Sequence, residues 1–125
     1  MRKFPAILAV ALLAVPAGAQ APALSLEQKT LLRCSAAFAI IANEQQRGIA
    51  SSLAYPPLAE RGKEYFVRSS ARLVDELQVT REHVEVMLRA EVEALQAGSM
   101  ASANPAQYVD QVMQPCLLSL AASGL

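Results

Sequence analysis

The chain of 125 residues has few of the residue types that build recognisable catalytic or metal sites. It contains two cysteines, one histidine (His83) and no tryptophan. Phosphate-binding glycine loops are absent, as are the C-x-x-C, H-E-x-x-H and EF-hand patterns and the G-x-S-x-G motif of hydrolase nucleophiles. Two thiols and one imidazole are too few for a standard zinc site. The sequence therefore predicts neither a metal centre nor a cofactor.

Signals for β-structure are equally scarce. No Asn-Gly or Asp-Gly dipeptide marks a hairpin, and β-branched residues do not alternate with polar ones over a convincing run. Helix-spaced apolar residues separated by caps and breakers account for the rest of the chain. We therefore expect an all-α protein.

The first nineteen residues have the composition of a secretory signal peptide. Arg2 and Lys3 form a short positive segment, residues 6–15 are apolar and uncharged, and Ala17 to Ala19 offer a small-residue cleavage site. The apolar run is about half the length that a membrane span requires. We expect residues 1–19 to be removed, leaving a single domain of residues 20–125 that is periplasmic or secreted.

Charge excludes two classes of partner. The full chain has eleven basic and eleven acidic residues; without Arg2 and Lys3, nine basic residues remain and the net charge is −2. Nucleic-acid binding depends on clustered positive charge, and adsorption to anionic lipid depends on a polybasic segment. The mature chain has neither feature, so we expect it to bind neither nucleic acid nor anionic lipid surfaces. We also expect no membrane span in the mature chain.

Cys34 and Cys116 both lie in the mature segment. An even number of cysteines in a small exported domain predicts a disulfide, and within one chain only this pairing exists. Two buried free thiols, or disulfides between chains, are the alternatives.

Four helices are expected, which would form a bundle-like domain stapled by the disulfide. Ser25 with Gln28 gives a capping box for the first helix, Pro57 suits the start of the second, and Thr80 and Asn104 are N-cap residues for the third and fourth. The predicted helices cover residues 26–47, 58–77, 81–97 and 105–122.

Three local features refine this prediction. Residues 34–42 (CSAAFAIIA) have no charge on any face, so the first helix should be central and enclosed by the others. Gly98 is expected to end the third helix. Pro115 lies inside the fourth helix and predicts a kink or a break near residues 111–114.

Lys63 and Glu91 are charges on otherwise apolar helix faces. Because an unpaired buried charge is costly, they could meet as a buried ion pair. Alternatively, Lys63 extends to water and Glu91 lies at the edge of a tilted apolar stripe. A buried glutamate with a raised pKa could also serve as an acid catalyst.

A stripe of basic residues with one aromatic runs along the predicted second helix, and it could hold an acidic partner or an anionic ligand. The alternative is a solvated face neutralised by neighbouring acidic residues. The stripe consists of Arg61, Tyr65, Arg68 and Arg72.

Residues 32–38 (LRCSAAF), 55–57 (YPP) with 61–62 (RG), and 114–117 (QPCL) resemble segments of small, uncharacterised exported helical proteins of alphaproteobacteria. The resemblance covers most of the mature chain and implies no activity. The general plan is also similar to HdeA-type periplasmic acid chaperones, which are richer in charge, and to helical immunity proteins that neutralise secreted peptidoglycan-attacking effectors.

Together these features predict a non-enzymatic exported protein that binds another periplasmic protein or a small apolar ligand through a helix face or groove. An immunity, inhibitor or acid-chaperone-like role is one alternative. A small hydrolase built around Glu91 is the other.

Overall fold

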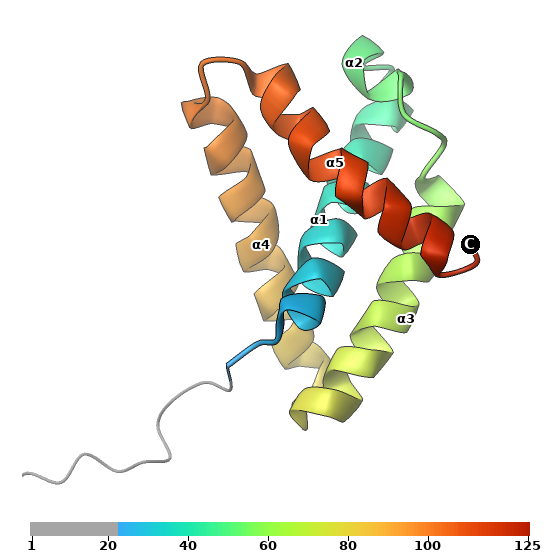
Figure 1. Cartoon of the computed structure of the whole chain (residues 1–125), viewed down its shortest axis with the longest axis vertical. Helices are drawn as coiled ribbons and strands as arrows, with labels where there is room; N and C mark the ends of the chain where they lie inside the picture. Colours follow the sequence, from blue (N-terminus) through green and yellow to red (C-terminus); the bar gives the residue numbers. More distant parts are fainter. Residues whose placement is uncertain (1–22) are drawn as a thin grey trace, which may run out of the picture.

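The structure is a computed structural model that describes residues 23–125. The predicted signal peptide, residues 1–19, lies outside this range. The described residues form an all-α fold without strands (Figure 1). The helices are α1 (Leu26–Gln46), α2 (Ala50–Leu53), α3 (Ala59–Leu77), α4 (Arg81–Ala101) and α5 (Pro105–Ala122). No helix within residues 23–125 combines the length and apolar character needed to cross a membrane.

Helix α1 is the centre of the fold and packs against the other helices, with α5 crossing in front of it in Figure 1. The Ser25 hydroxyl accepts a hydrogen bond from Gln28 N, and the Gln28 side chain accepts one from Ser25 N, which completes the predicted capping box. Residues 34–38 are all buried, and Phe38 is fully enclosed. The predicted central position of this helix is confirmed.

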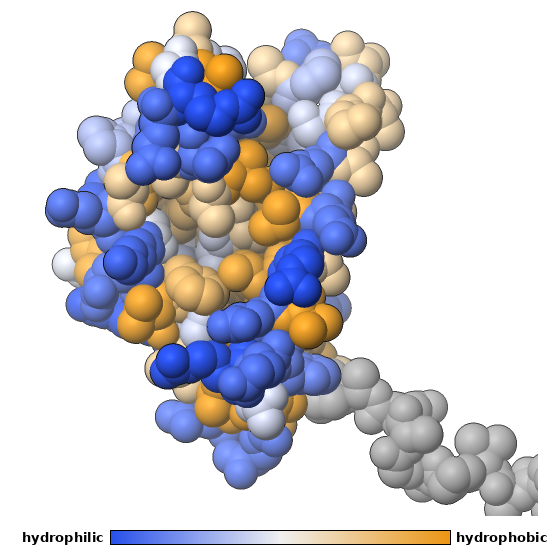
Figure 2. Space-filling model, turned by 180° about the vertical axis from the view of Figure 1, so that it is seen from behind, coloured by the Kyte–Doolittle hydropathy of each residue, from blue (hydrophilic) through white to orange (hydrophobic). Residues whose placement is uncertain are grey.

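One face of α1 stays open, contrary to the prediction that its apolar segment is enclosed on every side. Ala39 is exposed and Ala42 is half-buried. Helices α3 and α4 flank this face without a further helix to cover it, and Figure 2 shows it hollowed, with hydrophobic atoms inside and hydrophilic side chains along the edges. Alanine leaves little apolar area in water here, so the exposure costs little.

The predicted disulfide between Cys34 and Cys116 is confirmed, with a Cα–Cα distance of 5.1 Å and 82 residues of sequence separation. Both residues are buried in the main core. The bond links the middle of α1 to the second half of α5.

The buried face of α3 consists of Gly62, Tyr65, Ser69 and Leu73. A β-carbon on Gly62 would lie 3.1 Å from Phe38 Cβ, so glycine brings α3 close to α1. This close approach lets Tyr65 enter the core.

Helix α4 continues through Gly98 to Ala101, so the predicted end at residue 97 is wrong. Helix α5 has the predicted bounds, and the Asn104 side chain accepts a hydrogen bond of 3.1 Å from Gln107 N. A kink or a break was expected near residues 111–114; there is no break, since α5 runs unbroken through Pro115. The missing N–H of Pro115 leaves the carbonyl of Gln111 without its helical donor, and Gln111 is exposed, so water can solvate this carbonyl.

Candidate functional site

The largest described cavity lies between α1, α4 and α5 and has a volume of about 480 Å³. This is within the range of about 300–1,000 Å³ that is typical of small-molecule sites. We call it the main cavity. It is lined by Ala37, Ile40, Ile41, Glu44, Leu95, Gln96, Ser99, Met100, Tyr108, Val109, Val112 and Met113.

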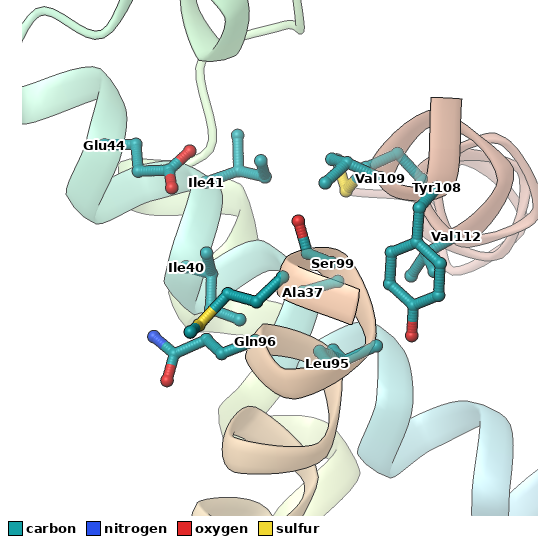
Figure 3. A pocket seen from close by; sticks show the side chains of 12 residues that line it. Ala37, Ile40, Ile41, Glu44, Leu95, Gln96, Ser99, Tyr108, Val109 and Val112 are labelled. Atoms are coloured by element: carbon teal, nitrogen blue, oxygen red, sulfur yellow. The ribbon is translucent and has the colours of Figure 1, made fainter. Parts of the chain in front are cut away.

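The walls of the main cavity are mostly aliphatic, with a few polar groups among them (Figure 3). Ile40 and Ile41 come from α1, Leu95 from α4, and Val109 and Val112 from α5. Apolar walls with a small number of placed polar groups are characteristic of sites that bury an apolar ligand and orient it.

Glu44 is the one charged residue among the described residues that line the main cavity. In the view of Figure 3, its carboxylate lies at the opposite side of the cavity from Tyr108, and Ser99 lies between them. Glu44 takes part in none of the three ion pairs found among the described residues. The cavity therefore has an acidic end at which no cation of residues 23–125 forms an ion pair.

A second cavity of about 350 Å³ adjoins the first. It shares Glu44, Ser99 and Val109 with the main cavity, so these residues mark the junction between the two. Tyr55 lines this adjoining cavity, and its hydroxyl donates a hydrogen bond of 3.1 Å to Asp110 Oδ1. Partial burial and then this carboxylate raise the pKa of Tyr55.

The Glu44 side chain is held from one side only. The Ser52 hydroxyl donates a hydrogen bond to Glu44 Oε2, and Ser52 itself is buried. No described residue donates a hydrogen bond to Glu44 Oε1. One oxygen of the carboxylate is thus fixed by the protein, and the other is free to accept a hydrogen bond from a ligand.

Gln45 places Ser52 beside Glu44 by holding the loop that contains α2. Gln45 Nε2 lies 3.0 Å from Ser52 O, 3.2 Å from Tyr55 O and 3.0 Å from Pro56 O, while Leu58 N donates a hydrogen bond of 3.1 Å to Gln45 Oε1. One amide side chain therefore satisfies backbone groups along the whole connection. The four-residue helix α2 within this connection was not expected from the sequence.

Gly98 shapes the opposite wall. A β-carbon at this position would lie 2.1 Å from the phenolic oxygen of Tyr108. The ring of Tyr108 therefore packs directly on the backbone of α4, and this contact explains why a glycine stands within the helix rather than at its end. Sequence reasoning treated Gly98 as a helix stop because the partner lies on another helix.

The predicted buried ion pair between Lys63 and Glu91 is not formed. Lys63 is exposed and Glu91 is half-buried, and neither joins an ion pair within residues 23–125. Lys63 borders a smaller cavity of about 270 Å³ on the open face of α1, together with Phe66 and Leu88. Its long side chain reaches water without a buried partner, and Glu91 lines none of the four cavities described.

The possible binding face of α3 does not form a continuous exposed surface, because Tyr65 is buried in the core. The Tyr65 ring meets Phe38 edge-on with 5.1 Å between centroids, and its hydroxyl lies 2.8 Å from Ser119 Oγ. Tyrosine tolerates burial when its hydroxyl finds a partner, and Ser119 on α5 supplies one. The sequence alone does not reveal this long-range contact.

The arginines of that face bind groups within the chain. Arg61 donates to Leu125 O at 2.5 Å, and Arg68 donates to Glu64 at 3.2 Å and to Ser123 O at 3.3 Å. Their donors are thus directed at the C-terminal segment and at a neighbouring carboxylate. This arrangement favours a structural role over recognition of an acidic partner.

Arg72 of α3 binds two carboxylates, Glu27 of α1 and Glu76 of α3 itself. Its guanidinium lies 2.7 Å from Glu27 Oε1 and 2.6 Å from Glu76 Oε1, and Gln28 Nε2 donates to Glu76 Oε2 at 2.9 Å. Hydrogen bonding to Arg72 lowers the pKa of Glu27; hydrogen bonds from Gln28 and then Arg72 lower the pKa of Glu76. The same carboxylates raise the pKa of Arg72.

The remaining titratable candidate, His83, is exposed in the first turn of α4 and lines none of the four cavities. Within the described residues, no group of three or more histidine, cysteine, aspartate or glutamate side chains is arranged to hold a metal ion. Sequence reasoning missed Glu44, Ser99 and Tyr108 as site residues. No motif connects them, because they come together from three helices.

Comparison of the chain with protein-family models, curated proteins and solved structures finds no match.

Proposed function

We propose that this protein is an exported, non-enzymatic binding protein that holds a small apolar ligand in the main cavity. The observation that carries the proposal is the cavity of about 480 Å³, with aliphatic walls and one charged lining residue, Glu44. Its size and composition suit the burial of a hydrocarbon or aromatic body with one polar end.

Export to the periplasm or the medium is supported by two independent features. The composition of residues 1–19 is that of a signal peptide. The disulfide between Cys34 and Cys116 is of the kind that persists in an oxidising compartment.

A binding role is favoured over catalysis by the arrangement of the polar groups. Among the described residues lining the main cavity, Glu44 and Tyr108 carry titratable side chains. The Tyr108 hydroxyl lies against Gly98, on the other side of the cavity from Glu44 in Figure 3. An acid and a base that act together on one substrate would both have to lie within hydrogen-bond reach of its reacting atoms.

The test is to fill the cavity. Ser99→Phe places a ring at the junction of the two cavities, whereas Ala94→Phe places the same ring on the exposed face of the same helix. An environment-sensitive apolar dye should bind the wild-type protein and Ala94→Phe equally, and Ser99→Phe at least about tenfold more weakly. Equal dye binding by all three proteins would reject the main cavity as the site.

A further inference from the structure

We infer that the ligand of the main cavity is a cationic amphiphile, with an amine or ammonium head at Glu44 and an apolar tail among the aliphatic side chains. The inference rests on the proposed function and adds to it the charge of the ligand. Among residues 23–125, Glu44 is the one charged residue that lines the two adjoining cavities, and no lysine or arginine of this range lines either of them.

The geometry of the carboxylate favours a donor from the ligand. Ser52 fixes Oε2 of Glu44, and Oε1 has no hydrogen-bond donor among residues 23–125. Ser52 is buried and Gln45 holds its loop, so the carboxylate is already oriented before a ligand arrives. A fixed acceptor at the edge of an apolar cavity binds an N–H donor without the cost of ordering a mobile side chain.

Two helix ends add to the negative potential. Glu44 lies in the last turn of α1 and Ser99 in the last turn of α4, and neither turn contains a basic residue. The C-cap residue of α1, Arg47, is exposed and forms no ion pair within residues 23–125. The C-terminus of a helix carries a partial negative charge that favours a nearby cation. The start of α5 also borders the adjoining cavity, but Pro105 has no N–H and Asn104 caps the N–H of Gln107.

An anionic amphiphile fits the same space poorly. A fatty-acid carboxylate in the main cavity would have no cationic partner and would share the junction with Glu44. Two like charges without a counter-charge in a partly apolar site repel each other, which lowers the affinity for the anionic ligand several-fold or more. Among ligands of equal tail length, the cavity should therefore bind those with a cationic head more tightly than those with an anionic head.

The experiment compares probes that share one tail: decylamine, decyltrimethylammonium, decanol and decanoate, all below their micelle concentrations. Displacement of an apolar dye from the full mature chain gives the affinity of each. We expect decylamine to bind about tenfold or more tightly than decanol, because a hydrogen bond to a charged group is worth at least that factor. Decanoate should bind most weakly.

Glu44→Gln removes the charge and keeps the shape, and Glu85→Gln, on the exposed face of α4, is the matched control. Glu44→Gln should lose the preference for decylamine, keep its affinity for decanol and gain affinity for decanoate. Glu85→Gln should behave as the wild type does. Retained decanol binding shows that the variant is folded, so loss of selectivity reports on the charge alone.

Two results overturn the inference, and they are distinguishable. If decanol binds but decylamine binds no more tightly, or if Glu44→Gln leaves the preference intact, the cationic head is wrong and the apolar site stands. If none of the four probes displaces the dye from the wild-type protein, both the inferred cationic ligand and the proposed function are wrong.

Discussion

The ring of Tyr108 occupies the space in which a side chain at position 98 would begin, since a β-carbon on Gly98 would lie 2.1 Å from the phenolic oxygen. This contact sets the distance between α4 and α5 at one end of the main cavity. It also explains why α4 extends to Ala101 through a residue that commonly ends helices. The glycine is used for close approach between two helices.

This contact predicts strong coupling between positions 98 and 108. Alanine in place of glycine within a helix is ordinarily stabilising by about 1 kcal/mol. With Tyr108 present, Gly98→Ala must displace the ring, so this gain should be lost or reversed. In the background of Tyr108→Leu, the same substitution should stabilise by about 1 kcal/mol. A double-mutant cycle on unfolding free energies measures the coupling, and additive effects would contradict the packing described.

The disulfide between Cys34 and Cys116 should be a large contributor to stability. It closes a loop with 82 residues of sequence separation, for which the chain-entropy model gives about 4.5 kcal/mol. Replacing both cysteines with alanine should lower the free energy of unfolding by roughly that amount in urea titrations. A reductant should destabilise the wild type and leave the double variant unchanged. A loss below about 1 kcal/mol would show that the bond adds little to the fold.

Gln45 should stabilise its loop far more than its neighbour Gln46 does. Gln45→Ala leaves the carbonyls of Ser52, Tyr55 and Pro56 and the N–H of Leu58 without their side-chain partner. Ser52 and Leu58 are buried residues, and since a buried group left without its partner costs about 1–3 kcal/mol, we expect a loss of about 2 kcal/mol. The matched variant Gln46→Ala, at an exposed position, should change stability little.

Hydrogen exchange at the Leu58 amide is the local readout for that prediction. This amide donates to Gln45 Oε1 in the wild-type protein. It should exchange faster in Gln45→Ala than the global loss of stability explains. Unchanged protection of Leu58 would mean that the loop is held by other contacts.

The Arg72 cluster predicts a specific pH dependence. The folded-state pKa values of Glu27 and Glu76 are lowered, so the ionised carboxylates contribute stability above their ordinary value of 4.5. This stability is lost as the pH falls through the folded-state pKa values. Arg72→Gln should therefore flatten the decline of unfolding free energy below about pH 4.5. The control Arg33→Gln, an exposed residue outside the three ion pairs, should retain the wild-type slope.

Local signals were sufficient for most of the helix bounds. Ser25 and Asn104 cap their helices as the sequence indicates, and the cysteine count was enough to pair Cys34 with Cys116. The helix caps depend on residues a few positions apart, and two cysteines allow one disulfide within the chain. The sequence therefore predicted the all-α fold and its covalent link.

The errors arise where a residue's role depends on a distant partner. Gly98 was predicted to end its helix because its contact with Tyr108 cannot be seen in the sequence. Tyr65 was placed on an exposed face because its contacts with Phe38 and Ser119 cannot be seen there either. An amphipathic tyrosine suits either face of a helix. The main cavity is invisible in the sequence for the same reason, because its walls come from three helices.

The most direct test of the account is the position of a bound tail. Nuclear Overhauser effects between decylamine methylene protons and isotope-labelled methyl groups locate it without any substitution. We predict contacts to Ile40, Val109 and Val112 in the main cavity, and none to the exposed residues Val86 and Leu118. Contacts confined to the exposed methyl groups, with none to the cavity, would contradict the central claim.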